Sequence, residues 1–304
     1  MSDETNWRHL AIVGPTASGK SGLALQMASE NDELEIVSVD SMQVYRGMDI
    51  GTAKPSIEEQ ERVKHHLIDL VEATCDFTVQ EFQVAAREAL IDIESRGKTA
   101  LLVGGTGLYL QAITDDLAFP GSFPDIRADL ENTGETNELF AELSDFDPEA
   151  AQKMEPNNRR RIVRALEVIR GTGKRFSSFG PGVTTFGPTN IRMLGIWLPR
   201  EQVAHNIEER YTAQMQDGFL DEVRLLDKQP PSRTARQALG YRELLAHLAG
   251  KLTLDEALTE AIRRTKSFAR RQRVWFRRDP RITWLGTHDA NDLVNTMTRY
   301  LEEI

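Results

Sequence analysis

Residues 14–21 read Gly14-Pro15-Thr16-Ala17-Ser18-Gly19-Lys20-Ser21, a complete G-x4-G-K-S pattern. The pattern lies between an apolar run at residues 9–13 and an amphipathic stretch with Leu23, Met27 and Ala28 on one side. A glycine-rich loop between a strand and a helix directs backbone N–H groups and the helix N-terminus at an anion. The sequence therefore predicts a phosphate-binding loop, in which Lys20 contacts the outer phosphates and the Ser21 hydroxyl binds Mg²⁺.

Short apolar runs recur along the chain and alternate with helical patterns. These runs occupy residues 9–13, 36–39, 100–103 and 193–198. Thr78 and Glu81 have the spacing of a capping box and predict a helix that ends near Gly97, and a second long helix is expected at about 255–278. Strands separated by helices indicate βαβ units. We therefore predict an α/β fold with a P-loop-type parallel sheet core.

Composition narrows the class of protein. A chain of 304 residues has room for about two domains at roughly 150 residues each. The 47 acids outnumber the 37 bases, which excludes a uniformly basic nucleic-acid-binding surface but not a local one. Cys75 is the single cysteine, so disulfide scaffolds and cysteine-rich zinc modules are excluded. No apolar run approaches the roughly 18 residues of a membrane span, and we expect a soluble, cytoplasmic protein with no membrane partner.

Charge is distributed unevenly in the middle of the chain. Residues 115–149 hold eleven acids and one base, Arg127, whereas residues 153–175 hold eight bases and two acids. Residues 176–190 are rich in Gly, Pro, Ser and Thr, as in a linker. We predict a mostly helical insertion domain at 117–190, within a core formed by 1–116 and 191–304.

Asp40 is the acid that follows the second predicted strand, and Thr106 follows the third. Because the carboxyl ends of parallel strands meet at one edge of a sheet, both should lie near the phosphate-binding loop. A carboxylate there could bind Mg²⁺ or act as a general base, and it could equally cap the following turn. A nucleotide kinase would carry an acid at the end of the third strand, where this chain has Gly104-Gly105-Thr106-Gly107.

Several longer blocks resemble one enzyme family. Asp40-Ser41-Met42-Gln43-Val44-Tyr45-Arg46-Gly47-Met48-Asp49-Ile50-Gly51-Thr52-Ala53-Lys54-Pro55 is similar to the signature of bacterial tRNA dimethylallyltransferases, the tRNA isopentenyltransferase family. The same holds for blocks at 65–69, 104–109, 237–242 and 270–277, which run in family order over nearly the whole chain. The adjacent His65 and His66 also suggest a metal, but neighbouring strand side chains point to opposite faces, which favours a structural role.

The resemblance implies an activity and a donor. A dimethylallyl group would pass from dimethylallyl diphosphate to N6 of adenosine 37, on the 3′ side of the tRNA anticodon, with release of diphosphate. The diphosphate would then be bound by Gly14, Pro15, Thr16, Ala17, Ser18, Gly19, Lys20, Ser21 and Arg210. Asp40 would accept the N6 proton. Mg²⁺ would bind Ser21, with Asp40 as a second candidate ligand. Thr106 would lie at the reacting centre, although its hydroxyl could instead cap the next helix.

The resemblance also implies contacts with the anticodon stem-loop of tRNA. The candidate residues are Asp40, Ser41, Met42, Gln43, Thr106, Arg127, Arg160, Arg161, Arg164, Gln237, Gly240, Tyr241, Arg242, Arg270, Arg271, Gln272 and Arg277. Basic side chains would position the RNA through its phosphates, and residues 40–43 would read the target base. We expect a monomer. Two other classes remain open: a small-molecule kinase that releases ADP, and an ATP-binding RNA module without transfer chemistry.

Overall fold

The computed structural model describes residues 7–180, 182–286, 296 and 298–299. The chain divides into two compact units. One comprises Met1–Asp115 and Phe186–Ile304, and the other comprises Asp116–Thr185. The second unit begins one residue before and ends five residues before the insertion predicted at 117–190. We refer to the first unit as the core and to the second as the insertion.

The core contains a parallel six-stranded sheet in the order β4-β2-β6-β1-β7-β8. Its strands are β1 (His9–Val13), β2 (Leu34–Val39), β4 (His65–His66), β6 (Thr99–Gly104), β7 (Ile191–Ile196) and β8 (Ile282–Leu285). The four longest strands are the four that the apolar runs predict. They are apolar at nearly every position because helices cover both faces of the sheet. The two edge strands, β4 and β8, are short and were not expected from the sequence.

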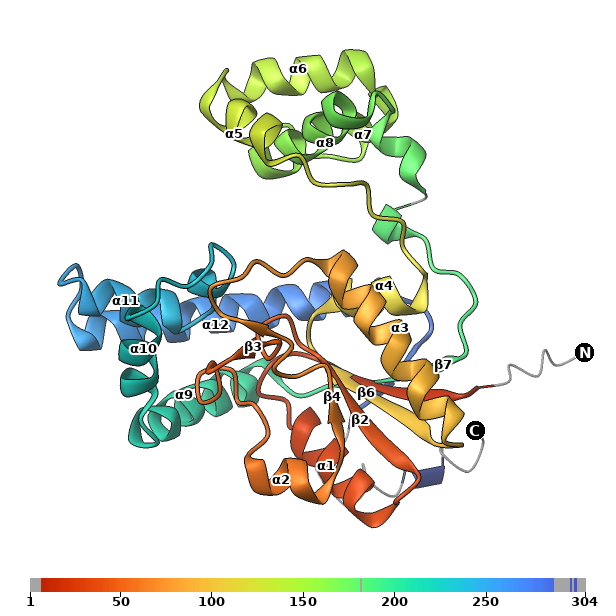
Figure 1. Cartoon of the computed structure of the whole chain (residues 1–304), viewed down its shortest axis with the longest axis vertical. Helices are drawn as coiled ribbons and strands as arrows, with labels where there is room; N and C mark the ends of the chain where they lie inside the picture. Colours follow the sequence, from red (N-terminus) through yellow and green to blue (C-terminus); the bar gives the residue numbers. More distant parts are fainter. Residues whose placement is uncertain (1–6, 181, 287–295, 297, 300–304) are drawn as a thin grey trace, which may run out of the picture. The chain divides into compact units, whose positions relative to one another are not determined.

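Alternate residues of each strand enter two different apolar clusters. Leu10, Ile12, Leu101 and Val103 pack with helix α1 (Lys20–Glu30) on one face. Ala11, Val13, Val37 and Leu102 belong to a larger cluster to which six helices contribute. Five of them are α3 (Val79–Ser95), α4 (Gly107–Thr114), α9 (Arg200–Gln216), α11 (Tyr241–Leu248) and α12 (Leu254–Phe276). The sixth, α10 (Phe219–Asp227), contributes Phe219 and Val223. Figure 1 shows α1 and α3 on opposite sides of the sheet.

Smaller elements complete the core. Two further strands of two residues each, β3 (Tyr45–Arg46) and β5 (Val71–Glu72), form a separate parallel pair that does not join the main sheet. The remaining elements are helix α2 (Ile57–Arg62) and the 3-10 turn η3 (Ala235–Gln237). Helix α3 begins after Thr78 with the capping box that the sequence predicts, since Thr78 and Glu81 exchange both hydrogen bonds.

A buried carboxylate attaches the edge strand β4 to the sheet. Glu35 of β2 has 3% of its side chain exposed and pairs with two Nη atoms of Arg96. His66 Nε2 lies 2.7 Å from Glu35 Oε2, and His65 Nδ1 lies 2.7 Å from the Val63 carbonyl. The Arg96 guanidinium holds the pKa of Glu35 at about 2, against the opposing effect of burial. Both histidines therefore have structural partners, as the sequence analysis favoured.

Arg281 bonds core residues on both sides of the insertion. Arg281 Nη1 donates to Asp115 Oδ1 at 2.7 Å and to the Gly187 carbonyl at 2.7 Å. The Gly187 N–H also donates to Asp115 Oδ1, at 3.0 Å. The last core residue before the insertion and one of the first after it are therefore bonded to each other and to the same guanidinium.

The insertion has its own apolar core. Its helices are α5 (Pro124–Asn132), α6 (Thr136–Phe146), α7 (Pro148–Gln152) and α8 (Arg159–Thr172), followed by the 3-10 turns η1 (Phe176–Phe179) and η2 (Gly182–Thr184). Leu130, Leu143, Ile162 and Leu166 are fully buried among these helices. Figure 1 shows α5, α6, α7 and α8 gathered in one unit. No helix in the described part of the chain is both long enough and apolar enough to cross a membrane.

Candidate active site

The phosphate-binding loop connects β1 to α1 at the carboxyl edge of the sheet. Gly19, the residue before α1, has φ of +86°, a left-handed conformation that glycine adopts without strain. Gly14 leaves no room for a side chain, because a Cβ there would lie 3.0 Å from the Ile196 carbonyl oxygen. The glycines of the G-x4-G-K-S pattern are thus needed for the shape of the loop.

Lys20 lies under this loop. It is 8% exposed, and its Nζ donates to the Pro15 carbonyl at 2.6 Å. Burial lowers the pKa of Lys20 to about 8; the Asp40 carboxylate opposes this shift and the Arg210 guanidinium adds to it. A lysine ammonium that is poorly solvated and close to a second cation favours the binding of an anion.

Two buried polar atoms at the loop have no hydrogen-bond partner within the described chain. They are Ser18 Oγ and Arg210 Nε. Another atom of Arg210, Nη1, donates to Thr16 Oγ1 at 2.8 Å, so the guanidinium of α9 reaches the loop as predicted. Since a buried hydroxyl or guanidinium N–H without a partner is costly, both atoms indicate an anion that would accept their hydrogen bonds.

Asp40 follows β2 at the same edge. Its Oδ1 accepts the Met42 N–H at 2.8 Å, so the carboxylate does cap the following turn. Burial raises the pKa of Asp40, although that turn and the nearby Lys20 and Arg210 cations act in the opposite direction. The capping contact uses one carboxylate oxygen, and a raised pKa suits a group that accepts a proton.

Thr106 precedes α4 but does not cap it. Its hydroxyl makes no capping hydrogen bond, and its Oγ1 instead accepts the Ser41 N–H at 3.2 Å. The Thr106 N–H donates to the Val39 carbonyl at the end of β2. The alternative in which the hydroxyl caps the next helix is therefore wrong, and Thr106 joins its loop to the residue after Asp40.

Gln272 of α12 lies inside the same site. Its Oε1 accepts the Thr16 N–H at 2.8 Å, and its Nε2 donates to the Gly105 carbonyl at 2.9 Å. With 6% of its surface exposed and both ends of its amide occupied, Gln272 supports the site in the described structure rather than facing RNA.

Three other residues predicted to contact tRNA are also buried. Gln43 is 9% exposed; its Oε1 accepts from Ser38 Oγ, and its Nε2 donates to the carbonyls of residues 52 and 53. Tyr241 is fully buried, and Gly240 has φ of +85° beneath the Phe219 ring. In the described structure these three residues lie in the protein interior, and their contact with tRNA stays a prediction.

Glu222 is a site residue that the sequence analysis missed. Its two oxygens accept the N–H groups of Asp49, Ile50 and Gly51 at 2.9, 2.7 and 3.1 Å. Its Oε1 also accepts the Tyr241 hydroxyl at 2.6 Å. Glu222 therefore holds residues 49–51, in the block 40–55, against α10. A glutamate on an amphipathic helix carries no local signal of such a contact.

The predicted basic residues fall into two groups. Arg127 and Arg164 bond Glu167, which is fully buried, at 2.7 Å each, so they stabilise the insertion. The exposed group comprises Arg160, Arg161, Arg242, Arg270, Arg271 and Arg277, and the neutral Gln237 is exposed as well. Within it, Arg242 bonds Gln237, Arg271 lies over the Phe268 ring and Arg277 over the Trp197 ring.

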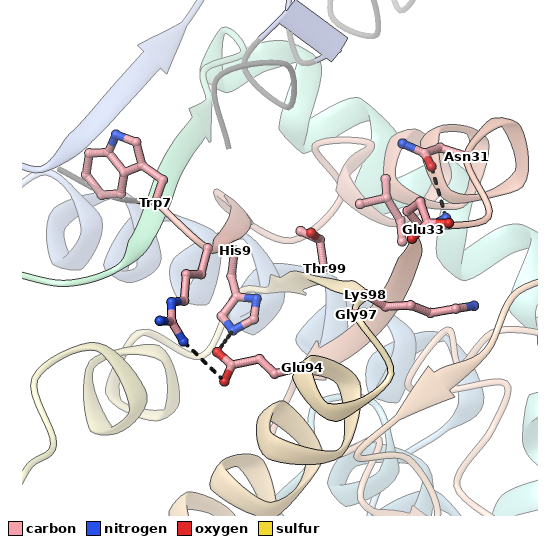
Figure 2. Close-up of a pocket in the computed structure, with 10 residues that line it drawn as sticks. Trp7, His9, Asn31, Glu33, Glu94, Gly97, Lys98 and Thr99 are labelled. Atoms are coloured by element: carbon pink, nitrogen blue, oxygen red, sulfur yellow. Dashed lines mark hydrogen bonds and ion pairs between the residues drawn. The ribbon is translucent and has the colours of Figure 1, made fainter. Parts of the chain in front are cut away.

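One cavity lies at the opposite edge of the sheet from the phosphate-binding loop. It has a volume of about 420 Å³ and is lined by the amino ends of β1, β2 and β6 and the end of α3. Figure 2 shows His9 directed at Glu94, and His9 Nε2 lies 3.0 Å from Glu94 Oε1. Arg8 Nη1 lies 3.6 Å from Glu94 Oε2. None of the predicted site residues lines this cavity. Among the described residues, no group of three or more His, Cys, Asp or Glu side chains is arranged to bind a metal.

Comparison with known proteins identifies the family. The sequence profile of the IPP transferase family matches residues 43–279. The chain belongs to the IPP transferase family. It is 46% identical over 298 residues to the tRNA dimethylallyltransferase of Bifidobacterium animalis subsp. lactis, covering 95% of this chain and 86% of that protein.

Solved structures of IPP transferases agree with this assignment. The tRNA isopentenylpyrophosphate transferase of Bacillus halodurans matches with a TM-score of 0.70 and 37% identity over 97% of both chains. A eukaryotic dimethylallyltransferase acting on tRNA matches with a TM-score of 0.77 and 25% identity, over 97% of this chain and 77% of that one. The predicted resemblance and the predicted α/β fold are both confirmed.

Proposed function

We propose that this protein transfers a dimethylallyl group from dimethylallyl diphosphate to N6 of adenosine 37 in tRNA, with release of diphosphate. The single observation that carries the proposal is the meeting of Asp40 with the Lys20 loop at one sheet edge, in a chain of the IPP transferase family. The relatives named tRNA dimethylallyltransferase support the donor and the acceptor.

The phosphate-binding loop would hold the leaving group. As the bond from the allylic carbon to oxygen breaks, negative charge grows on the departing diphosphate. The Lys20 ammonium and the Arg210 guanidinium are fixed in place before substrate arrives, and Ser18 Oγ and Arg210 Nε have hydrogen bonds to donate. Donors already oriented toward developing charge lower the barrier without the reorganisation that water would need.

Asp40 would act on the nucleophile. Adenine N6 forms a bond to the allylic carbon, the electrons of the breaking C–O bond leave with diphosphate, and N6 then sheds one proton. The Asp40 carboxylate would accept that proton, and its raised pKa makes it a better base than an exposed aspartate. Thr106 and Ser41, bonded to each other beside Asp40, would border the reacting centre.

Mg²⁺ is the cofactor we propose. The Ser21 hydroxyl at the start of α1 and the Asp40 carboxylate are hard oxygen donors, which Mg²⁺ prefers while it keeps several of its own waters. The unpartnered Ser18 Oγ and Arg210 Nε beside them fit a ligand that carries phosphate oxygens. When bound, the ion would neutralise part of the diphosphate charge.

The acceptor would be the anticodon stem-loop. N6 is poorly accessible in a stacked base, so the adenine would leave its stack to reach Asp40. Arg160, Arg161 and Arg270 are exposed and make no ion pair within the described chain, which leaves them available for phosphates. We further propose that the protein acts as a monomer in the cytoplasm.

A labelling experiment tests the proposal. The protein is incubated with radiolabelled dimethylallyl diphosphate, Mg²⁺ and unmodified tRNA, and the RNA is digested to nucleosides. We expect label in N6-dimethylallyl adenosine from position 37 and an equal amount of diphosphate. RNA without label would contradict the proposal, and release of ADP from ATP with a small acceptor would instead support a kinase.

A further inference from the structure

Gln272 connects two loops that the proposed reaction uses separately. Its side chain comes from the last turn of α12 and is 6% exposed. The Thr16 N–H can only donate and the Gly105 carbonyl can only accept, so these partners fix the orientation of the amide. One buried side chain therefore spans from the phosphate-binding loop to the loop that follows β6.

The contact is tight on the Gly105 side. A Cβ at Gly105 would lie 2.2 Å from Gln272 Nε2, so the backbone of this loop rests directly against the amide. The next residue, Thr106, accepts the Ser41 N–H. On the other side, the hydroxyl of Thr16 accepts from Arg210. Hydrogen bonds, together with the covalent chain of Thr16 and of residues 105–106, thus connect Arg210 through Gln272 to the residue after Asp40.

We propose that Gln272 is a positioning residue that sets the spacing between the phosphate-binding loop and the Asp40–Thr106 side of the site. The proposal rests on the proposed function, because that reaction needs the leaving group on one loop and the proton acceptor on the other to be aligned. A misplacement of about 1 Å between reacting groups can lower a rate about 100-fold. The same residue was expected from the sequence to contact tRNA, and the two roles predict different kinetics.

The first test is Gln272→Leu, which keeps the size of the side chain and removes both hydrogen bonds. We expect kcat to fall about 10- to 100-fold while KM for tRNA stays within about twofold. Gln26→Leu, at a surface glutamine of α1 that bonds only Glu30, is the matched control and should keep wild-type kinetics. A raised KM for tRNA with unchanged kcat would show an RNA contact and overturn the proposal.

Gln272→Glu gives a readout that loss of packing would not produce. A carboxylate can still accept the Thr16 N–H, but it presents an anion to the Gly105 carbonyl. The protonated carboxyl group restores one donor and one acceptor, as in the amide. The ratio of variant to wild-type kcat should therefore rise as the pH is lowered. A ratio that does not change with pH would contradict positioning by this hydrogen-bond pair.

Hydrogen–deuterium exchange tests the connection without requiring transfer activity. In Gln272→Leu, the Ser41 amide in a peptide covering 38–45 should exchange about tenfold faster, while β1 stays protected. Unchanged exchange there would refute the connection even if the enzyme is active. If the wild-type protein transfers no label but the variant loosens residues 38–45, the proposed function fails and the positioning role of Gln272 stands.

Discussion

At the scale of single residues, the charge of Lys20 should determine how the binding of dimethylallyl diphosphate depends on pH. Burial lowers its pKa to about 8, so the free protein loses this positive charge as the pH rises through about 8. We predict that kcat/KM for dimethylallyl diphosphate falls above that pH, since this ratio reports groups of the free enzyme. A rate profile from about pH 6 to 9.5 measures it. Constant kcat/KM up to pH 9.5 would show that Lys20 stays charged or is not needed.

Asp40 should determine how kcat falls at low pH. A carboxylate must be ionised to accept a proton, so kcat should fall as the pH drops through the raised pKa of Asp40. Asp40→Asn keeps an acceptor for the Met42 N–H and removes the base, and we predict a loss of about 100- to 10,000-fold in kcat with tRNA affinity unchanged. Asp32→Asn, at an exposed residue, is the control. An active Asp40→Asn protein would remove the general-base assignment.

Residue type predicted the chemistry of the site better than it predicted individual contacts. Lys20 and Asp40 meet as expected because a parallel sheet brings its carboxyl ends to one edge, and Arg210 reaches them from helix α9. Gln272 and Gln43 were expected at the RNA and are instead occupied within the protein. An amide bonds equally well to a base or to a backbone, and only the tertiary fold decides which partner it meets.

At the scale of elements, α10 holds the block 40–55 through one carboxylate. Glu222→Gln replaces an acceptor oxygen with an N–H₂ group that faces the donors of residues 49–51. We predict a loss of about 2 kcal/mol in the free energy of unfolding, measured by urea denaturation. Exchange of the amides at 49–51 should accelerate as well. Glu209→Gln on α9 is an exposed control, and equal stability of the two variants would argue against this contact.

The strands show which elements can be read from a sequence. Residues 9–13 form β1 as predicted, and the next two predicted strands, 36–39 and 100–103, lie within β2 and β6. Their continuous apolar runs reflect burial on both faces. The edge strand β4 consists of two histidines, and its partner is a glutamate 31 residues away. Such a strand depends on a hydrogen-bonded contact with a residue far away in the sequence, which no local pattern reveals.

At the scale of the whole molecule, the insertion should unfold as a unit of its own. Burial alone would raise the pKa of Glu167, but the Phe123 N–H, Arg127 and Arg164 outweigh that effect and lower it. Removing one partner of such a buried pair typically costs about 3 kcal/mol or more, which we predict for Glu167→Gln. Hydrogen exchange should accelerate over residues 124–172 and remain unchanged in β1 and β6.

The pH dependence of this difference follows from the sign of the shift. Because the pKa of Glu167 is lowered in the folded state, its contribution is full above the usual glutamate pKa and is lost as the pH falls through the lowered value. The stability gap between wild-type protein and Glu167→Gln should therefore narrow in acid. Glu149→Gln, on the surface of α7, should show no gap at any pH. A gap that widens in acid would contradict this account.

The hydrogen bonds of the Arg281 guanidinium should allow the insertion to be replaced by another segment. Since Asp115 and Gly187 are already bonded to each other and to Arg281, a short glycine-serine bridge could replace residues 117–185 without separating helix α4 from strand β7. The shortened chain should still fold and bind diphosphate. Insertions from related proteins could be attached at the same two residues, Asp115 and Gly187. A change of sequence or length in the insertion would then leave the carboxyl edge of the core sheet in place.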